Sequence, residues 1–342
     1  MPVFLFISQE DTMLSTALDL DAEGFHAGYI DVPASLNHSA WANLRVPLFS
    51  IKRGEGPRCL LLGGCHGDEY EGPIALSHLV HGELKLEDVQ GQIIVMPAFN
   101  TAAVQNGSRL SPLDDGNMNR AFPGNPRGTI TERIADFVTR ELIPRSDVVV
   151  DLHSGGRSLM FLPCTFVPVQ KTEAATQAIQ DLANAFDAPL SVTIREPSAA
   201  EMIDTEVERQ GKRILATELG GSALATANTI SITKRGRKGV LSSMGILKEQ
   251  AAIPATSKEK MTLLVDGLHH YTYSDDAGIY EMLFEPGSKV KQGQVIGYLH
   301  FADRVDRPPQ SVLANTSGVL FCTAGQGLVQ RGDVLAVVGH IE

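Results

Sequence analysis

From Arg58 onward, the chain alternates short apolar runs with stretches that carry helical signals. Runs of about four apolar residues that end in glycine or a polar residue are typical of buried strands in a parallel sheet. We predict strands at residues 58–63, 92–97, 147–152, 189–194 and 213–217, and helices at residues 73–83, 131–143, 171–187, 199–210 and 227–247. This order predicts an α/β fold in which helices flank a sheet, preceded by a short β region over residues 1–50.

The last quarter of the chain has a different texture. It is rich in glycine, and segment 290–296 (VKQGQVI) matches segment 329–335 (VQRGDVL), each preceded at a similar distance by a glycine, Gly278 or Gly318. Two related β units of this kind resemble the barrel-sandwich fold of lipoyl and biotinyl domains. Those carriers need a lysine between the two halves, and no lysine follows Lys291. We therefore expect a catalytic domain at residues 1–250 and a smaller all-β domain at residues 251–342 that carries neither cofactor.

Two of the predicted strands lead into residues that suit a metal ion. His66 and Glu69 follow the first strand, and His153 closes the third. The carboxyl ends of parallel strands meet at one edge of a sheet, so these side chains should share a crevice. Two histidines and one glutamate, with a position left for water, are typical of a catalytic zinc. The His66/Glu69 spacing alone is common, and a single histidine beside a strand is more often structural. The second histidine at an equivalent strand end favours a metal site.

Other polar residues suit the chemistry of hydrolysis. Glu218 ends a further predicted strand and is the candidate general base, although an exposed glutamate at a strand end is the alternative from spacing alone. The long polar loop at residues 107–124 carries Arg109 and Arg120, whose guanidinium groups suit a carboxylate or an oxyanion. Cys65 adjoins His66, but consecutive side chains leaving a strand point to opposite sides, so we expect its thiol to point away from the metal.

Composition limits the classes of partner. Forty acidic against 29 basic residues give a net charge of −11, which argues against binding to nucleic acid or to an anionic membrane. No run approaches membrane-spanning length, so we expect a cytoplasmic protein with reduced thiols, acting on a small molecule; a homo-oligomer stays open. The remaining histidines are expected to be structural or solvent-facing: His26, His38, His78, His81, His269, His270, His300 and His340.

Four motifs occur in an order that resembles the succinylglutamate desuccinylase/aspartoacylase family, a zinc carboxypeptidase-like group. They are HGDE at 66–69, NMNR at 117–120, DLHS at 151–154 and TELG at 217–220. The resemblance implies a zinc carboxypeptidase-like mixed sheet flanked by helices. It implies one Zn²⁺ per chain held by His66, Glu69 and His153, and Glu218 as general base. It further implies that Arg109 polarises the scissile carbonyl, and that Asn119 and Arg120 hold the substrate carboxylate.

The residues predict metal-assisted hydrolysis, and the resemblance implies a zinc-dependent amidohydrolase that removes an N-acyl group, expected to be acetyl, from a small amino acid. The resemblance favours N-alpha-acetylated 2,4-diaminobutyrate; succinylglutamate and N-acetylaspartate are alternatives within the family. The ammonium of diaminobutyrate needs an acceptor, for which Asp114, Asp115 and Glu71 are the candidates. A metallocarboxypeptidase for short peptides would use the same site. The non-enzyme alternative is a metal-containing small-molecule binder, but such a binder has no need of a base at Glu218.

Overall fold

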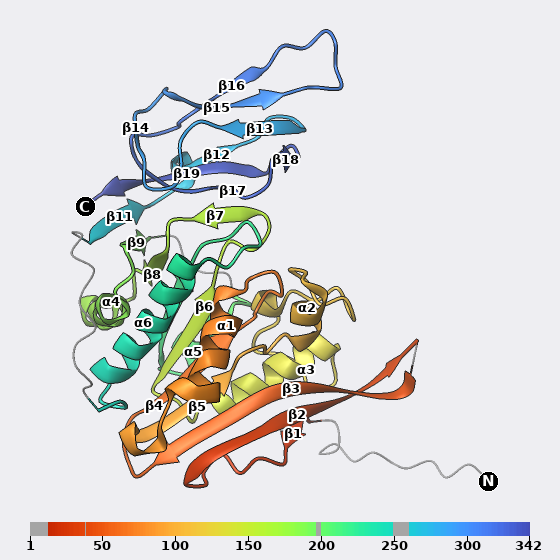
Figure 1. Cartoon of the computed structure of the whole chain (residues 1–342), viewed down its shortest axis with the longest axis vertical. Coiled ribbons are helices and arrows are strands. Elements are labelled where there is room, and N and C mark those ends of the chain that lie inside the picture. The colour runs from red at the N-terminus through yellow and green to blue at the C-terminus, as the bar shows by residue number, and fades with distance from the viewer. Residues whose placement is uncertain (1–12, 38, 196–199, 249–259) are drawn as a thin grey trace.

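The computed structural model describes residues 13–37, 39–195, 200–248 and 260–342 (Figure 1). Its strands are β1 (Ser15–Thr16), β2 (Gly24–Leu36), β3 (Ser39–Arg53), β4 (Arg58–Gly63), β5 (Gly91–Met96), β6 (Val148–His153), β7 (Leu159–Phe161), β8 (Cys164–Pro168), β9 (Leu190–Ile194), β10 (Arg213–Glu218), β11 (Met261–Val265), β12 (Tyr271–Tyr273), β13 (Gly278–Met282), β14 (Lys289–Val290), β15 (Val295–His300), β16 (Gln310–Leu313), β17 (Gly318–Ala324), β18 (Leu328–Val329) and β19 (Val334–Ile341).

Its α-helices are α1 (Glu71–His78), α2 (Thr101–Asn106), α3 (Ile130–Phe137), α4 (Glu173–Phe186), α5 (Ile203–Arg209) and α6 (Ala227–Ser243). Short 3₁₀ or π segments are η2 (Leu79–Glu83), η3 (Leu86–Asp88), η4 (Met118–Arg120), η5 (Val138–Leu142) and η6 (Leu268–His270). The five predicted strands are confirmed as β4, β5, β6, β9 and β10. The five predicted helices are confirmed as α1, α3, α4, α5 and α6, although residue 199, the predicted start of α5, lies outside the described residues.

One large mixed sheet runs through the molecule. Its centre is parallel, because β4 pairs with β5 and β6, and β6 pairs with β10, all in parallel. Next to β10 lies β8, which is antiparallel to it, so the sheet is mixed. The sheet continues past β5 into the long β2–β3 hairpin on one side, and through β9 and β11 to β19 on the other. Figure 1 shows this hairpin at one end of the molecule and the C-terminal strands at the other.

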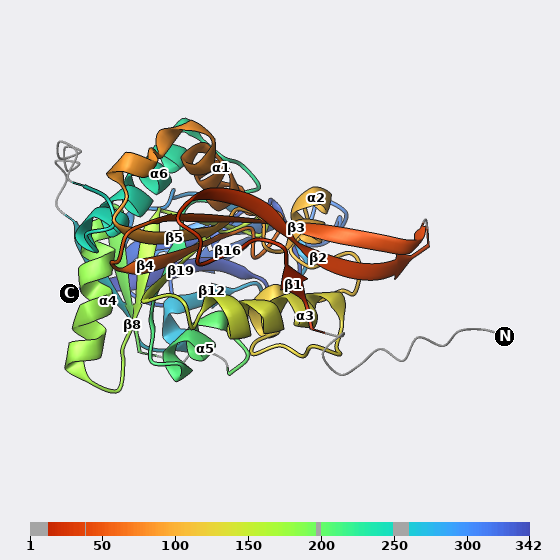
Figure 2. The same cartoon turned by 90° about the horizontal axis from the view of Figure 1, so that it is seen from below.

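Helices cover both faces of the parallel centre (Figure 2). Alternate side chains of a strand point to opposite faces. Leu61 therefore packs in the core beneath α1, α4 and α6, whereas Leu60 and Leu62 pack in the core beneath α3 and α5. Because both faces of these strands are buried, their sequences are continuous apolar runs. Each fully buried large apolar side chain stabilises the folded state by about 1.5–3 kcal/mol.

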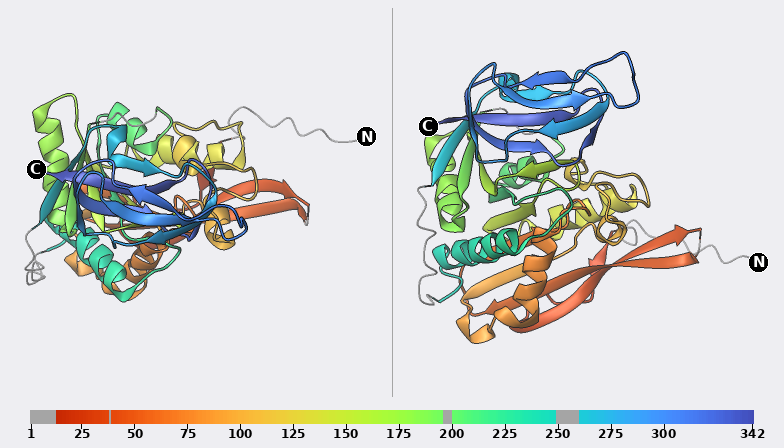
Figure 3. Two further views of the ribbon diagram at one scale, coloured as in Figure 1. Left: turned by 90° about the horizontal axis from the view of Figure 1, so that it is seen from above. Right: turned by 45° about the horizontal axis from the view of Figure 1, so that its top comes forward.

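The C-terminal strands confirm the internal repeat. Val290, the first residue of one copy, pairs with Gly318, and Val329, the first residue of the other, pairs with Gly278. Each copy thus pairs with the glycine that precedes the other copy. Strands β13, β15, β16 and β18 form a separate four-stranded antiparallel sheet that lies over β17 and β19 (Figure 3).

The connection between the catalytic part and the C-terminal part differs from the division into two domains that the sequence predicts. Residues 261–265 are predicted to belong with the C-terminal domain, but β11 lies in the large sheet between β9 and β19. The predicted boundary near residue 250 lies outside the described residues, so the division into two domains stays a prediction. Within the described ranges, no helix combines the length and apolarity that crossing a membrane requires.

Candidate active site

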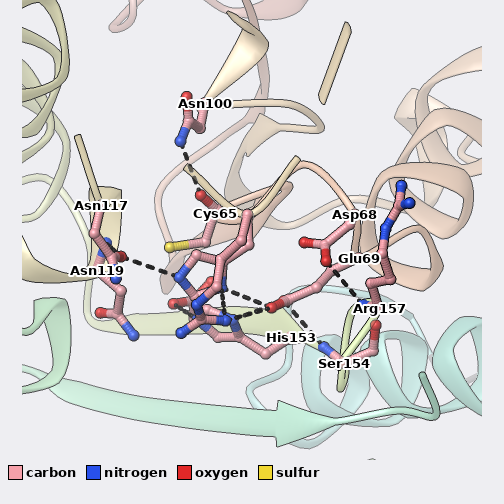
Figure 4. Close-up of polar contacts among 12 residues, drawn as sticks. Cys65, Asp68, Glu69, Asn100, Asn117, Asn119, His153, Ser154 and Arg157 are labelled. Atoms are coloured by element: carbon pink, nitrogen blue, oxygen red, sulfur yellow. Dashed lines mark hydrogen bonds and ion pairs between the residues drawn. The ribbon is translucent and has the colours of Figure 1, made fainter. Parts of the chain in front are cut away.

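The predicted metal ligands meet at the carboxyl edge of the parallel strands. His66 and Glu69 lie in the turn that follows β4, and His153 is the last residue of β6. Glu218 is the last residue of β10 and pairs in register with His153. Parallel strands of similar length bring their ends to one edge, which is why residues far apart in sequence converge here (Figure 4).

Glu69 bridges the two histidines through both of its carboxylate oxygens. Its Oε1 lies 2.6 Å from Nδ1 of His66, and its Oε2 lies 2.8 Å from Nδ1 of His153. The far nitrogen of each ring has a partner of its own. Nε2 of His66 donates to Oδ1 of Asn117 at 3.1 Å, and Nε2 of His153 donates to Oδ2 of Asp151 at 2.8 Å.

This pattern fits a metal ion. Both nitrogens of each ring face an oxygen that only accepts hydrogen bonds, and a neutral ring carries one proton; with that proton at Nε2, the lone pair is at Nδ1. Two lone pairs therefore face the oxygens of Glu69, an arrangement that a cation stabilises. Imidazole nitrogens and a carboxylate are zinc ligands, and a hydrogen-bonded far nitrogen is the usual support of a ligating histidine.

The charges of the cluster point the same way. Burial of Glu69 disfavours its charge, yet His153 and His66 outweigh burial and lower its pKa to about 2. Burial also opposes charge on His153, but Asp151 and Glu69 raise the pKa of its ring well above the usual value. The cluster thus attracts positive charge, which a bound divalent ion would supply.

Glu218 has the properties of a group that accepts and returns a proton. Its carboxyl is buried, and burial together with the negative charge of Glu69 raises its pKa to about 8. Among the described residues, its Oε2 has no hydrogen-bond partner. A pKa near neutrality suits a general base that must later act as an acid.

The structure brings Arg109 and Asn119 to the same place, and Arg120 beside them. Nη1 of Arg109 lies 3.3 Å from Nδ1 of His66 and 3.7 Å from Oε1 of Glu69. Asn119 is buried, and its Oδ1 accepts from the backbone N–H of Ile203 at 3.3 Å, which leaves its NH₂ group as a donor. Arg120 is exposed, and its Nη1 donates to the carbonyl oxygen of Asn119 at 2.7 Å.

The prediction that Cys65 points away from the metal ligands is wrong. A ligand atom of Cys65 lies in one group with those of His66 and His153, all within 4.8 Å of one another. The strand ends at Gly63, and Gly64 has a φ of 71°, so the strict alternation of side chains stops before Cys65. Burial raises the pKa of the Cys65 thiol to about 12, which favours the neutral thiol over the thiolate that binds metals.

Two residues that support the histidines were not singled out in the sequence. Asp151 lies two positions before His153 on one strand, and that spacing places both on the same face, so it was a usable signal. Asn117 lies within the NMNR motif, and its Oδ1 also accepts from the backbone N–H of Asn119 at 3.1 Å. A third residue, Asp204 on α5, is close enough for Asp151, His153 and Arg120 to influence its charge; burial is the main cause that raises its pKa to about 7. No motif marked Asp204.

Comparison with known proteins agrees with this geometry. Residues 55–244 match the model of the succinylglutamate desuccinylase/aspartoacylase catalytic domain. The chain is 40% identical over 333 residues to N-alpha-acetyl-L-2,4-diaminobutyric acid deacetylase of Halomonas elongata, which covers 97% of this chain and 96% of that protein.

Solved structures give the same result. The product-bound structure of the ectoine utilization protein EutE (DoeB) from Ruegeria pomeroyi has a TM-score of 0.91 at 40% identity, with 96% of this chain and 99% of that chain covered. A succinylglutamate desuccinylase/aspartoacylase from Rhodobacter sphaeroides has a TM-score of 0.91 at 35% identity, with the same coverage of 96% and 99%. The chain therefore belongs to the succinylglutamate desuccinylase/aspartoacylase family of hydrolases.

Proposed function

We propose that this chain is a zinc-dependent deacetylase that hydrolyses N-alpha-acetyl-L-2,4-diaminobutyrate to acetate and 2,4-diaminobutyrate during the breakdown of ectoine. The observation that carries the chemistry is the convergence of the Nδ1 atoms of His66 and His153 on Glu69, next to Glu218. The names of the relatives from Halomonas elongata and Ruegeria pomeroyi support the substrate.

His66, Glu69 and His153 would hold the zinc ion. When bound, zinc lowers the pKa of a water molecule and polarises a carbonyl group. Asp151 and Asn117 keep the two rings in the tautomer that presents Nδ1. The backbone N–H of Ser154 donates to Oε2 of Glu69 at 3.1 Å and helps to fix the carboxylate.

Glu218 moves the proton. In the proposed reaction it takes a proton from the attacking water as the C–O bond forms, and returns that proton to the amide nitrogen as the C–N bond breaks. Nη1 of Arg109 lies 3.7 Å from Oε1 of Glu69, and its guanidinium group can stabilise the negative charge that develops on the carbonyl oxygen. The second proton of the water follows to the same nitrogen, so the products are a carboxylate and an ammonium group, and atoms and charge balance without a further reactant.

Asn119 and Arg120 would bind the carboxylate of the substrate. The amide NH₂ of Asn119 is a buried donor, and Arg120 can supply a charge-assisted bond from the rim.

One candidate carboxylate for binding the substrate ammonium, Asp114, already has partners in its own loop. Asp114 accepts from the N–H and the hydroxyl of Thr131, at 2.7 and 2.8 Å, and from the N–H of Gly116 at 3.1 Å, so its role is to hold its own loop. Asp115 and Glu71 remain candidates, and we add Asp204, whose charge is influenced by those of His153 and Arg120.

A comparison of kcat/KM tests the substrate directly. We expect N-alpha-acetyl-2,4-diaminobutyrate to be preferred over N-acetylaspartate and succinylglutamate by about 100-fold or more, because a site that pairs a buried charge rejects analogues that lack it. A preference for either acidic substrate would make the deacetylase assignment wrong while leaving the amidohydrolase intact. A preference for short peptides would identify a metallocarboxypeptidase instead.

A further inference from the structure

Three histidines outside the active site lie together in the C-terminal part of the chain. His269 and His270 are on η6, and His340 is on β19. Their ring centroids are 4.2 Å (His269–His270), 4.7 Å (His270–His340) and 5.9 Å (His269–His340) apart. One ligand atom from each lies within 4.8 Å of the other two. The pairing of β11 with β19, which places Leu264 opposite His340, brings η6 to this position.

His270 presents a lone pair to a carboxylate. Its ring is buried, and its Nδ1 lies 2.6 Å from the carbonyl oxygen of Val338. A carbonyl only accepts, so Nδ1 is the donor and the lone pair of the neutral ring is at Nε2. That Nε2 lies 2.9 Å from Oδ1 of Asp266, which is also an acceptor. Either a second ring proton or a metal ion stabilises this contact, and the histidines of the active site face Glu69 in a similar way.

The other two rings each have a polar partner of their own. Nε2 of His269 lies 3.5 Å from the same Oδ1 of Asp266, and this side chain is 53% exposed, so it can adjust. Nε2 of His340 lies 2.7 Å from the hydroxyl of Thr316, which fixes the ring and leaves Nδ1 as its ligand atom.

We propose that His269, His270 and His340 form a second metal site, with Asp266 beside two of the rings, that binds a divalent ion of the zinc class. Imidazole nitrogens are preferred zinc ligands, and a nearby carboxylate can supply a further oxygen ligand or balance the charge of the ion. The carbonyl of Val338 and the hydroxyl of Thr316 support the rings from behind, as ligating histidines require. A proton on His270 alone would explain one contact but not the gathering of all three rings.

The position of this histidine cluster suggests what the ion does. Asp266, His269 and His270 follow β11, the strand by which the chain leaves the catalytic part of the sheet. His340 lies near the end of β19, the strand that closes the C-terminal part. An ion at the cluster would tie the first and last strands of that part together beside the large sheet.

Metal stoichiometry tests the proposal. Protein stripped with a chelator, refilled with Zn²⁺ and passed through a desalting column should contain two zinc ions per chain. H269N/H340N should contain one, and H66A/H153A should also contain one, held at the histidine cluster. Zn²⁺ should raise the Tm of H66A/H153A, because an ion that binds only the folded protein stabilises it. The Tm of the variant that combines all four substitutions, H66A/H153A/H269N/H340N, should not change.

H300N is the matched control. His300 pairs with Glu281 at 2.7 Å in the same part of the chain, and both are exposed, so this variant should keep two ions. If H269N/H340N does not fold, H269N alone should weaken Zn²⁺ binding to H66A/H153A at least tenfold, since the ring it removes is half exposed. Wild-type protein that saturates at one zinc, lost entirely in H66A/H153A, would overturn the proposal. Retention of two ions by H269N/H340N would do the same.

Discussion

At the level of single residues, Glu69 organises the active site. It is almost completely buried, both of its oxygens contact histidine nitrogens, and Oε2 also accepts from the backbone of Ser154. Removing a buried charge of this kind leaves its partners uncompensated, so a loss here should affect the site as a unit. Glu218 is different, because its Oε2 has no hydrogen-bond partner among the described residues and is free for chemistry.

Glu218→Gln should separate binding from catalysis. The amide keeps the size of the side chain but cannot accept a proton, so kcat should fall by about 10²- to 10⁴-fold while the zinc content stays the same. Steady-state kinetics with metal analysis measures both. Glu173→Gln, an exposed glutamate on α4, is the control that should change neither. A loss of less than tenfold would move the base elsewhere, with Glu71 the next candidate.

Arg120→Ala should weaken substrate binding more than turnover. Loss of one charge-assisted hydrogen bond to the carboxylate should raise KM about 10- to 100-fold, with a smaller effect on kcat. Arg127→Ala removes an exposed arginine further along the same loop and should leave KM unchanged. An unaltered KM in Arg120→Ala would show that Arg120 does not hold the carboxylate.

The sequence could reveal site residues at the ends of strands, but not those that tertiary packing brings to the site. His66, His153 and Glu218 stand at strand ends that apolar runs mark clearly, so their convergence could be predicted. The position of Cys65 could not, because it depends on the backbone turn at Gly64. Asp204 also could not, because only the packing of α5 against β10 brings it near the site.

At the level of elements, the turn between β4 and α1 leaves no room for a side chain at Gly67. A Cβ on Gly67 would lie 1.9 Å from the backbone of Ala103 at the start of α2, and the N–H of Gly67 donates to the carbonyl of Ser108 at 2.8 Å. This close packing fixes the backbone between His66 and Glu69. The glycine is therefore part of what holds the two ligands in place.

Gly67→Ala should destabilise the fold and disturb the metal site together. The clash is with backbone, which no rotamer relieves, so the free energy of unfolding should fall by about 3 kcal/mol or more. Urea denaturation measures this, and zinc affinity should fall in parallel. Gly327→Ala is the matched control, since a Cβ there meets nothing within 4 Å. Equal stability of Gly67→Ala and wild type would contradict the described packing.

The loops of the C-terminal part contain an ion-pair cluster, formed by Asp276 with Arg304 and Arg307, whose contribution to stability should depend on pH. Asp276 accepts hydrogen bonds from Arg307 and Arg304, and the Arg307 bond is the main cause that lowers the pKa of Asp276 to about 2. A pKa that is lower in the folded than in the unfolded state stabilises the fold above the unfolded value of about 3.9. That contribution is lost as the pH falls towards the folded value.

Asp276→Asn should therefore have a lower Tm than wild type at pH 7, and the difference should shrink as the pH falls from about 4 towards 2. Thermal unfolding over a pH series measures it. Asp303→Asn, an exposed aspartate of the same part, should follow wild type throughout. A Tm difference that is independent of pH would show that charge is not the cause.

Most elements of the α/β part were predictable, but the long hairpin of β2 and β3, with 13 and 15 residues, was expected only as a short β region. β7 has three residues, and β8 ends in a proline, so neither carries the long apolar run that marked the other strands. The antiparallel direction of β8 against β10 is set by tertiary packing and left no local signal. The internal repeat, by contrast, marked two related β units, and in the structure each copy pairs with the glycine that precedes the other copy.

At the level of the whole molecule, the C-terminal part supports the active site. β7, which follows the loop after His153, pairs with β17. The N–H of Leu162 donates to the carbonyl of Phe321, and the N–H of Gly325 donates to the carbonyl of Ser158, both at 2.8 Å. The C-terminal strands therefore hold the loop beyond His153 from outside (Figure 3).

The C-terminal part also contributes to the surroundings of Glu218. Its charge acts on the buried thiols of Cys164 on β8 and Cys322 on β17, and burial is the main cause that raises the pKa of each thiol well above its usual value. Neutral thiols behind Glu218 give it an apolar surrounding, in agreement with its own raised pKa of about 8. The environment of the proposed base is thus built jointly by the catalytic and the C-terminal parts.

Turnover by metal-free protein is the most direct test of the proposed hydrolysis. Protein dialysed against a chelator and verified as metal-free by elemental analysis should release no amine from N-alpha-acetyl-2,4-diaminobutyrate. Addition of Zn²⁺ should restore turnover, and far-UV circular dichroism should be the same before and after, because the active site lies at strand ends outside the apolar core. Full amine release by the verified metal-free protein would contradict the roles proposed for His66, Glu69 and His153.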